Sequence, residues 1–218
     1  MNKQIDNHIK TLQTWDKLAD QYQEKFMDMD LYNDGYDTFC DLVEKQHPDV
    51  FEIGCGPGNI TRYILSKRPD FNILAIDTSP NMIRLAKENN PAAGFRVMDC
   101  REIDSLQQKF DAIICGFCMP YLSKNDCIKL IKDCSFLLKN GGILYLSTIE
   151  NDYNKSTFET SSDGQHTMFV YYHEEGYLQE VLRENNFELV ELHRKMFPKA
   201  DGTTSTHMIF IARKITKS

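Results

Sequence analysis

The chain lacks several features that would assign it to common classes of protein. It has no run of about 18 apolar residues, so we expect no segment to span a membrane. Residues 1–10 are polar, unlike the apolar stretch of a signal peptide. Basic residues are not in excess, because 25 Lys and Arg stand against 32 Asp and Glu, a net charge of −7. Phosphate backbones and anionic membranes attract basic surfaces, so we expect neither nucleic acid nor a membrane as partner.

The cysteine pattern argues against a disulfide framework and against a metal site. The chain has 7 cysteines, an odd number spread over 218 residues, whereas secreted disulfide frameworks have even numbers in shorter chains. We therefore expect reduced thiols and a cytoplasmic location. One Cys-x-x-Cys, from Cys115 to Cys118, has no second pair at metal-ligand spacing, so no metal site is predicted.

The length of 218 residues is close to that of a single domain. Hydrophobic periodicity predicts that this domain is of the α/β class. Apolar steps of three and four residues indicate helical segments at the start of the chain, and short apolar runs then alternate with helical patterns. Such alternation is typical of a mostly parallel sheet. The predicted helices are 9–26, 36–45, 59–66, a helix opened by Ser79 and Pro80, 125–138 and 174–184, and the predicted strands are 50–53, 73–76, 95–98, 112–115, 143–149, 187–192 and 206–212. Residues 150–166 are expected to form a long loop before the β-prone segment 167–172.

The first strand runs into a glycine-rich turn made by Gly54, Gly56 and Gly58. Glycine permits backbone conformations closed to other residues and lets a ligand approach the main chain. Dinucleotide-binding enzymes place the third glycine three residues after the second, whereas here it follows after two. A tight strand–helix turn without a ligand is the alternative interpretation.

Carboxylates follow the next two strands. Asp77 lies about 20 residues past the glycine turn, where an acidic side chain can accept hydrogen bonds from both ribose hydroxyls. Its alternative role is to cap the helix that begins near Pro80. Asp99 follows the third strand and can accept from an exocyclic amine such as adenine N6. The carboxyl ends of parallel strands share one edge, so these groups are expected to line one crevice.

Several stretches carry a resemblance to a known family: EIGCGPG at 52–58, AIDTSPNM at 75–82, MDC at 98–100, FDAII at 110–114 and LLKNGGIL at 137–144. With them the chain resembles the class I S-adenosylmethionine-dependent methyltransferases of the small-molecule type, over roughly residues 15–213. The resemblance implies a Rossmann-like sheet of seven strands in the order 3-2-1-4-5-7-6, with the last strand antiparallel and N-terminal lid helices. It divides the single domain 1–218 into cap helices (1–47), a cofactor-binding core (48–149), a lid or acceptor loop (150–172), and a C-terminal helix with an antiparallel hairpin (173–218).

The resemblance also implies which residues hold the cofactor. The glycine turn would face the methionine part, Asp77 the ribose and Asp99 the adenine amino group. Tyr22 would close the pocket, although it also lies on the apolar stripe of its helix, where a core position is equally consistent. The full implied set is Tyr22, Gly54, Cys55, Gly56, Asp77, Thr78, Met82, Asp99, Cys100, Cys115 and Gly116.

The implied reaction moves a methyl group from S-adenosylmethionine to a small-molecule acceptor by in-line displacement and leaves S-adenosylhomocysteine. Such a transfer needs a general base only if the acceptor must lose a proton, and the candidates are His166, His173 and Glu150. For each, a solvated loop position is the alternative. The stretch 117–121 lacks the Asn/Asp-Pro-Pro-aromatic motif of enzymes that methylate base amines or glutamine amides, which argues against nucleic acid. Three alternatives remain open: a non-catalytic protein that binds this cofactor, a methyltransferase acting on a protein side chain, and a nicotinamide dehydrogenase.

Overall fold

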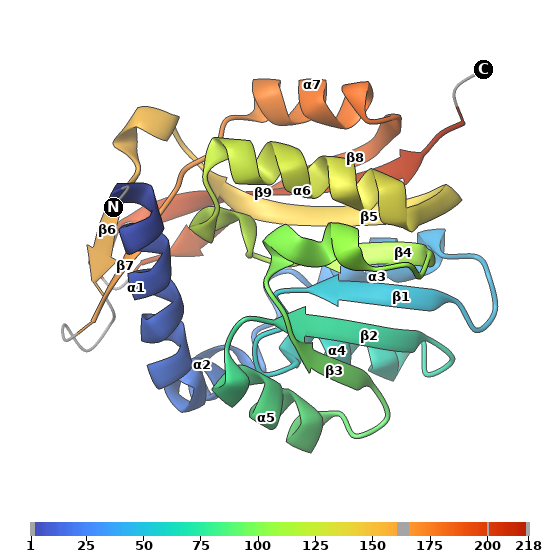
Figure 1. Cartoon of the computed structure of the whole chain (residues 1–218), viewed down its shortest axis with the longest axis horizontal. Helices are drawn as coiled ribbons and strands as arrows, with labels where there is room; N and C mark the ends of the chain where they lie inside the picture. Colours follow the sequence, from blue (N-terminus) through green and yellow to red (C-terminus); the bar gives the residue numbers. More distant parts are fainter. Residues whose placement is uncertain (1–2, 161–165, 200, 217–218) are drawn as a thin grey trace.

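A seven-stranded sheet forms the centre of the molecule in the computed structural model, which describes residues 3–160, 166–199 and 201–216 (Figure 1). The inner strands are buried on both faces, as parallel strands covered by helices are, and this explains their nearly unbroken apolar sequences. The strands in spatial order are β3 (Gly94–Val97), β2 (Asn72–Asp77), β1 (Asp49–Ile53), β4 (Phe110–Cys115), β5 (Leu138–Glu150), β9 (Thr204–Lys214) and β8 (Phe187–Pro198).

The order of this sheet confirms the predicted fold class. Strands β1 to β5 pair in parallel, and β9 pairs antiparallel with both β5 and β8. The order β3-β2-β1-β4-β5-β9-β8 is the predicted 3-2-1-4-5-7-6, renumbered because two short strands precede the final pair.

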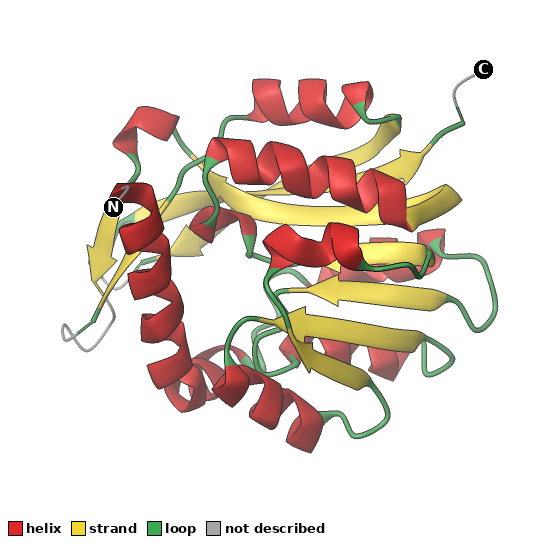
Figure 2. Ribbon diagram, in the orientation of Figure 1, coloured by secondary structure: helices red, strands yellow, loops and turns green. Residues whose placement is uncertain are grey.

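Helices cover both faces of the sheet (Figure 2). On one face, α3 (Asn33–Leu42), α4 (Asn59–Lys67) and α5 (Pro80–Asn89) contribute to a core that contains Phe39 and Tyr145. On the other face, α6 (Lys124–Leu137) and α7 (Glu175–Glu184) build a core around Phe110. Short 3₁₀ turns complete the chain: η1 (Cys100–Ser105), η2 (Met119–Tyr121) and η3 (Tyr153–Lys155).

The N-terminal segment forms two helices where one was predicted, α1 (Lys3–Lys17) and α2 (Ala19–Phe26). The break lies at Leu18, whose ψ of 12° departs from helical geometry. Beyond the carboxyl edge of the sheet, α1 packs on β7 (Thr167–Val170) through two threonines. The Thr14 hydroxyl donates to the Thr167 carbonyl at 3.1 Å, and the Thr11 hydroxyl accepts from the Phe169 N–H at 2.9 Å. Segments 150 residues apart thereby join at this edge.

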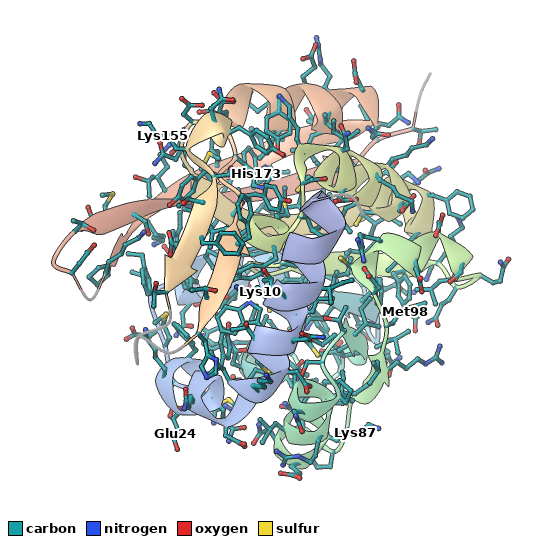
Figure 3. All side chains as sticks on the ribbon, turned by 60° about the vertical axis from the view of Figure 1, so that its left-hand side comes forward. Lys10, Glu24, Lys87, Met98, Lys155 and His173 are labelled. Carbon is teal, nitrogen blue, oxygen red and sulfur yellow. The ribbon has the colours of Figure 1, made fainter. Side chains whose placement is uncertain are left out.

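The prediction that residues 150–166 form a long loop was partly wrong. Its residues include η3 and the strand β6 (Thr157–Thr160), which pairs antiparallel with β7 in a separate two-stranded sheet, while 161–165 lie outside the described residues. Strand β6 reads Thr-Phe-Glu-Thr, with too little apolar alternation to indicate a strand from sequence. The Nζ atom of Lys10 in α1 lies 5.2 Å from the centre of the Phe158 ring of this sheet. Lys10 is labelled in Figure 3, which brings this side of the molecule forward. Among the helices of the described segments, none is both long and apolar enough to cross a membrane.

A substitution in the stacked pair of Phe51 and Phe110 tests how tightly the core beneath the sheet is packed. Phe110 is fully buried, and its ring lies parallel to that of Phe51 at 4.8 Å. We expect Phe110→Ala to lower the free energy of unfolding by about 3–5 kcal/mol, because it removes a large side chain and leaves a cavity. Urea unfolding measures this change. The matched control is Phe136→Ala, since Phe136 is 60% exposed and should shift stability by no more than about 0.5 kcal/mol. Equal losses in the two variants would contradict this description of the core.

Candidate functional site

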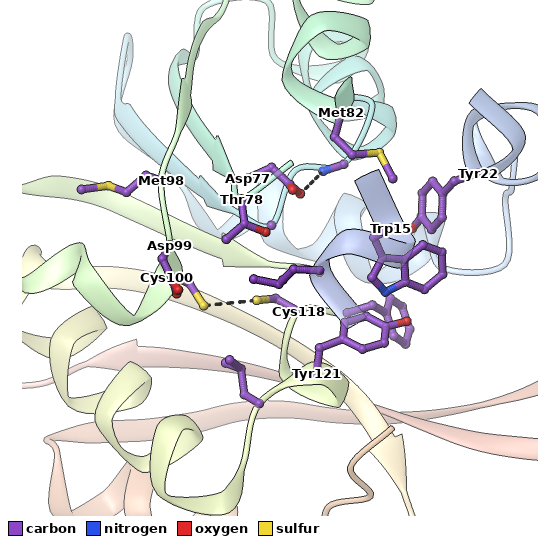
Figure 4. Close-up of a pocket in the computed structure, with 16 residues that line it drawn as sticks. Trp15, Tyr22, Asp77, Thr78, Met82, Met98, Asp99, Cys100, Cys118 and Tyr121 are labelled. Atoms are coloured by element: carbon purple, nitrogen blue, oxygen red, sulfur yellow. Dashed lines mark hydrogen bonds between the residues drawn. The ribbon is translucent and has the colours of Figure 1, made fainter. Parts of the chain in front are cut away.

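A single cavity collects most of the residues expected to hold a cofactor (Figure 4). It lies where β1, β2, β3 and β4 end, at the carboxyl edge of the sheet, where ligands bind in open α/β folds. Counted out into the open solvent at its mouth, its empty space is about 750 Å³. Its lining residues are Leu12, Trp15, Tyr22, Gly54, Gly56, Asp77, Thr78, Met82, Met98, Asp99, Cys100, Gly116, Phe117, Cys118, Tyr121 and Leu122.

The glycine turn sits close to the segment after β4. Gly54 has φ of +71°, and a Cβ atom added to it would lie 2.9 Å from the Cβ of Cys118. Both the backbone conformation and the space therefore require glycine here. The N–H groups of Gly54 and Cys55 donate to the Ile76 carbonyl at 2.8 and 2.9 Å, which ties the turn to the end of β2.

Asp77 connects the glycine turn to the start of α5. Its Oδ2 accepts from the Gly56 N–H and its Oδ1 from the Ser79 N–H, each at 2.9 Å. Burial raises the pKa of Asp77 above its ordinary value, while the backbone hydrogen bonds from Ser79 and Gly56 act in the opposite direction. Ser79 rather than Asp77 caps α5, because its hydroxyl accepts from the Met82 N–H, while the Asp77 carboxylate binds the Ser79 N–H and lines the cavity. Each oxygen retains a second lone pair, so ribose hydroxyls can still donate to it.

The wall beside Asp77 is formed by Thr78, Met82, Asp99 and Cys100, as Figure 4 shows. Asp99 accepts from the Arg101 N–H at 2.9 Å and also pairs with the Arg101 guanidinium, with a shortest distance of 2.5 Å. This ion pair fixes the carboxylate at the cavity edge, and the role of Asp99 toward adenine stays a prediction.

An aromatic wall stands opposite, made by Trp15 of α1, Tyr22 of α2 and Tyr121 of η2. The centre of the Trp15 ring lies 5.4 Å from those of both Tyr22 and Tyr121, at interplanar angles of 89° and 68°. Tyr22 also covers the glycine turn, since a Cβ on Gly56 would lie 3.6 Å from its ring. Sequence reasoning identified Tyr22 but not Trp15 or Tyr121. The only sequence signal for Trp15 was its place on the apolar helical stripe.

Two predicted cofactor residues do not line the cavity with their side chains. Cys55 is 1% exposed and packs in the core beneath α3 and α4, and Cys115 is fully buried on the opposite face of the sheet. Their predicted contribution is therefore limited to the backbone. Gly116 does line the cavity, and a Cβ there would meet the Cδ1 of Ile60 at 2.2 Å.

None of the three candidate bases lines the cavity. His173 is fully buried, with Nε2 3.0 Å from the Met119 carbonyl and Nδ1 hydrogen-bonded to the Tyr177 hydroxyl; burial lowers its pKa to about 4. Glu150 is ion-paired with Arg194 at 2.6 Å. His166 is partly buried and also lies outside the lining set. The alternative of a solvated loop position is wrong for His173, which is buried and lies within hydrogen-bond distance of the Met119 carbonyl in η2.

Sequence reasoning missed the buried carboxyl of Glu52, which lies in β1 two residues before Gly54. It is fully buried, and its Oε2 accepts from the Thr61 hydroxyl of α4, while Oε1 has no hydrogen-bond partner. Burial raises the pKa of Glu52 to about 8. A charged residue inside the apolar run 50–53 was the available signal, because buried carboxyls are rare without a specific role. Across the described segments, no cluster of three or more His, Cys, Asp or Glu side chains could hold a metal ion.

Comparisons with known proteins agree with this geometry. A family model described as "Methyltransferase domain" matches residues 50–142. A malonyl-[acyl-carrier protein] O-methyltransferase of Acetivibrio thermocellus is 34% identical over 110 residues, 50% of this chain and 38% of that protein. A tRNA N(3)-methylcytidine methyltransferase of Schizosaccharomyces pombe is 25% identical over 203 residues, 83% of this chain and 81% of that protein. The match to the Acetivibrio thermocellus protein thus spans well under half of that protein's length.

Among solved structures, the chain is similar to a Burkholderia thailandensis 1,6-didemethyltoxoflavin-N1-methyltransferase, which was solved with 1,6-didemethyltoxoflavin and S-adenosylhomocysteine bound. The TM-score is 0.72, and the match covers 99% of this chain and 92% of that one at 17% sequence identity. At this identity the likeness establishes the fold.

The raised pKa of Glu52 predicts a pH dependence of stability. Because the folded state binds this proton more tightly than the unfolded state, the stabilisation is complete below about pH 4.5 and is lost as pH rises through about 8. Relative to Glu52→Gln, we expect the wild-type free energy of unfolding to fall by up to about 1.4 kcal/mol per pH unit across this interval. Urea unfolding at three pH values between about 5 and 8 measures the difference. A wild-type-minus-variant difference that stays constant with pH would overturn the assignment.

Proposed function

We propose, on the premise that residues 50–142 form a class I S-adenosylmethionine-dependent methyltransferase domain, that the chain transfers the methyl group of this cofactor to a small-molecule acceptor. The observation that carries the proposal is the cavity itself. It brings the Gly54 turn, the Asp77 carboxylate and the Asp99 carboxylate together at the ends of three neighbouring strands. S-adenosylmethionine carries a methionine part, a ribose and an adenine, and the glycine turn and the two carboxylates are groups that can bind these three parts.

The residues present fit the cofactor in shape and in donor chemistry. Absence of a Cβ at Gly54 and Gly56 leaves the main chain open to the methionine part, and Asp77 offers its remaining lone pairs to the ribose hydroxyls. Thr78 and Met82 would flank the adenine, and Asp99 with the Cys100 N–H would bind its edge. Met82 lines the cavity with an apolar side chain, which would pack against the adenine.

The bound cofactor would supply a methyl group already activated by a positive sulfur, so the chain mainly has to orient it and exclude water. Helix α1 supports this role, because Leu12 and Trp15 line the cavity while Thr11 and Thr14 hold the helix on β7. Fixing two reactants in line can give effective molarities on the order of 10⁵–10⁸ M. This is consistent with a cavity wall that carries none of the three candidate bases.

A small molecule fits the cavity better than a nucleic acid. None of the described residues that line it is Lys, Arg or His, and the net charge of the chain is −7. Phosphate contacts draw on cationic side chains, so the tRNA activity of one relative is not carried over here. We extend the proposal to a reducing, cytoplasmic compartment, which the seven free cysteines support.

A thermal-shift experiment tests cofactor choice. S-adenosylhomocysteine at 100 times its Kd would stabilise the folded state by about 2.7 kcal/mol and raise the melting temperature by several degrees. NAD at the same concentration should leave it unchanged. The reverse result would favour a dehydrogenase. If S-adenosylhomocysteine binds but a broad panel of metabolites yields no methyl incorporation, the non-catalytic binding protein becomes the better description.

Gly54→Ala tests the glycine turn, with Gly202→Ala as its control. Both glycines have positive φ, +71° and +80°, so each substitution strains the backbone to a similar degree. Only the Gly54 methyl would press on Cys118 in the cavity wall, because nothing lies within 4 Å of a Cβ at Gly202. We expect Gly54→Ala to weaken S-adenosylhomocysteine binding at least about ten-fold in calorimetry, a loss of about 1.4 kcal/mol. Gly202→Ala should bind normally, and equal affinities in the two variants would refute the assignment.

A further inference from the structure

Among the described residues that line the cavity there is no histidine or lysine to remove a proton from an acceptor. Its two carboxylates, Asp77 and Asp99, accept backbone N–H groups, and Asp99 also pairs with Arg101. Burial and the nearby Asp77 raise the pKa of Tyr22 to about 12, and burial raises the pKa of Tyr121 well above its ordinary value. These phenols therefore stay protonated at neutral pH. An alcohol or phenol acceptor would find no base here.

Acceptors that are already anionic are disfavoured for a different reason. A carboxylate or a thiolate needs no base, but it needs a cation or several N–H donors to replace its water shell. Among the described lining residues the charged ones are Asp77 and Asp99, both acidic. An anionic acceptor beside the aromatic wall would therefore have no cationic side chain among the described lining residues to replace its water shell.

The aromatic wall favours positive charge. Trp15 lies at 89° to Tyr22 and at 68° to Tyr121, with both ring centres 5.4 Å away. All three rings line the cavity, and the faces of aromatic rings attract cations. Figure 4 shows these three side chains together, apart from Asp99 and Cys100.

From these three observations we infer that the acceptor is an uncharged nitrogen heteroaromatic, of the pyridine type, methylated on a ring nitrogen that carries no proton. The inference rests on the proposed function. The ring-nitrogen lone pair forms the new N–CH₃ bond while the C–S bond breaks and its electron pair returns to sulfur. No proton is released, so no base is needed. The positive charge passes from sulfur to the ring nitrogen, beside the rings of Trp15, Tyr22 and Tyr121.

Binding of product-like probes to the full chain saturated with S-adenosylhomocysteine tests the inference. N-methylpyridinium and toluene have the same shape and differ in charge, and benzoate supplies the opposite charge. We expect NMR titration to give N-methylpyridinium a Kd at least ten-fold lower than that of toluene or benzoate, as cation–π contacts with two or three rings would produce. Equal binding of N-methylpyridinium and toluene, tighter binding of benzoate, or no binding of the cation would each overturn the inference.

Variants of the aromatic wall test whether the preference for the cation arises from these three rings. Tyr121→Leu should remove at least half of the ten-fold preference, whereas Tyr121→Phe keeps the ring and should retain it. Trp15→Leu should act like Tyr121→Leu, and Tyr121→Leu carries the test alone if the helix variant does not fold. A preference that survives both leucine substitutions would place the cation elsewhere and refute the assigned wall. A chain that fails to bind S-adenosylhomocysteine contradicts the proposed function, whereas one that binds it without preferring the cation contradicts this inference alone.

Discussion

The hydrogen bonds of one partly buried carboxylate, Asp77, organise the site. One oxygen accepts from Gly56 in the glycine turn and the other from Ser79 at the start of α5, each at 2.9 Å. Removing the carboxylate would leave two backbone N–H groups unpaired in a partly buried site, which is costly. The same side chain faces the cavity. The positions of the turn, the helix and the ligand-facing oxygens are therefore set by one group, and the proposed ribose contact uses lone pairs that the fold leaves over.

The cavity has two chemically different ends. The end made by β1, β2 and β3 presents backbone and carboxylates and derives from segments close in sequence. The aromatic end joins Trp15 of α1 to Tyr121 of η2, more than 100 residues later. It depends on the packing of α1 on β7 through Thr11 and Thr14. The first end suits a cofactor common to many enzymes, and the second is where this chain would distinguish its acceptor.

The cofactor end could be predicted from the sequence because its signals are local. Glycines after a buried strand and Asp77 after the next strand fix their own positions once the parallel sheet is inferred. The aromatic wall could not, since no local pattern distinguishes Trp15 in a core from Trp15 in a cavity wall. The same holds for Cys55, whose neighbour Gly54 lines the cavity while its own side chain points into the core. Strand β6 was missed because its sequence, Thr-Phe-Glu-Thr, has little of the apolar alternation that indicates a strand.

The most direct test of the central claim is a crystal structure of the chain with S-adenosylhomocysteine. The account predicts both ribose hydroxyls within about 3 Å of the Asp77 carboxylate oxygens, the usual hydrogen-bond distance. It also predicts that the Gly56 and Ser79 N–H groups keep their hydrogen bonds to the same side chain and that the vacated methyl position faces Trp15 and Tyr121. A ribose held by other residues, with Asp77 bonded only to Gly56 and Ser79, would contradict the account.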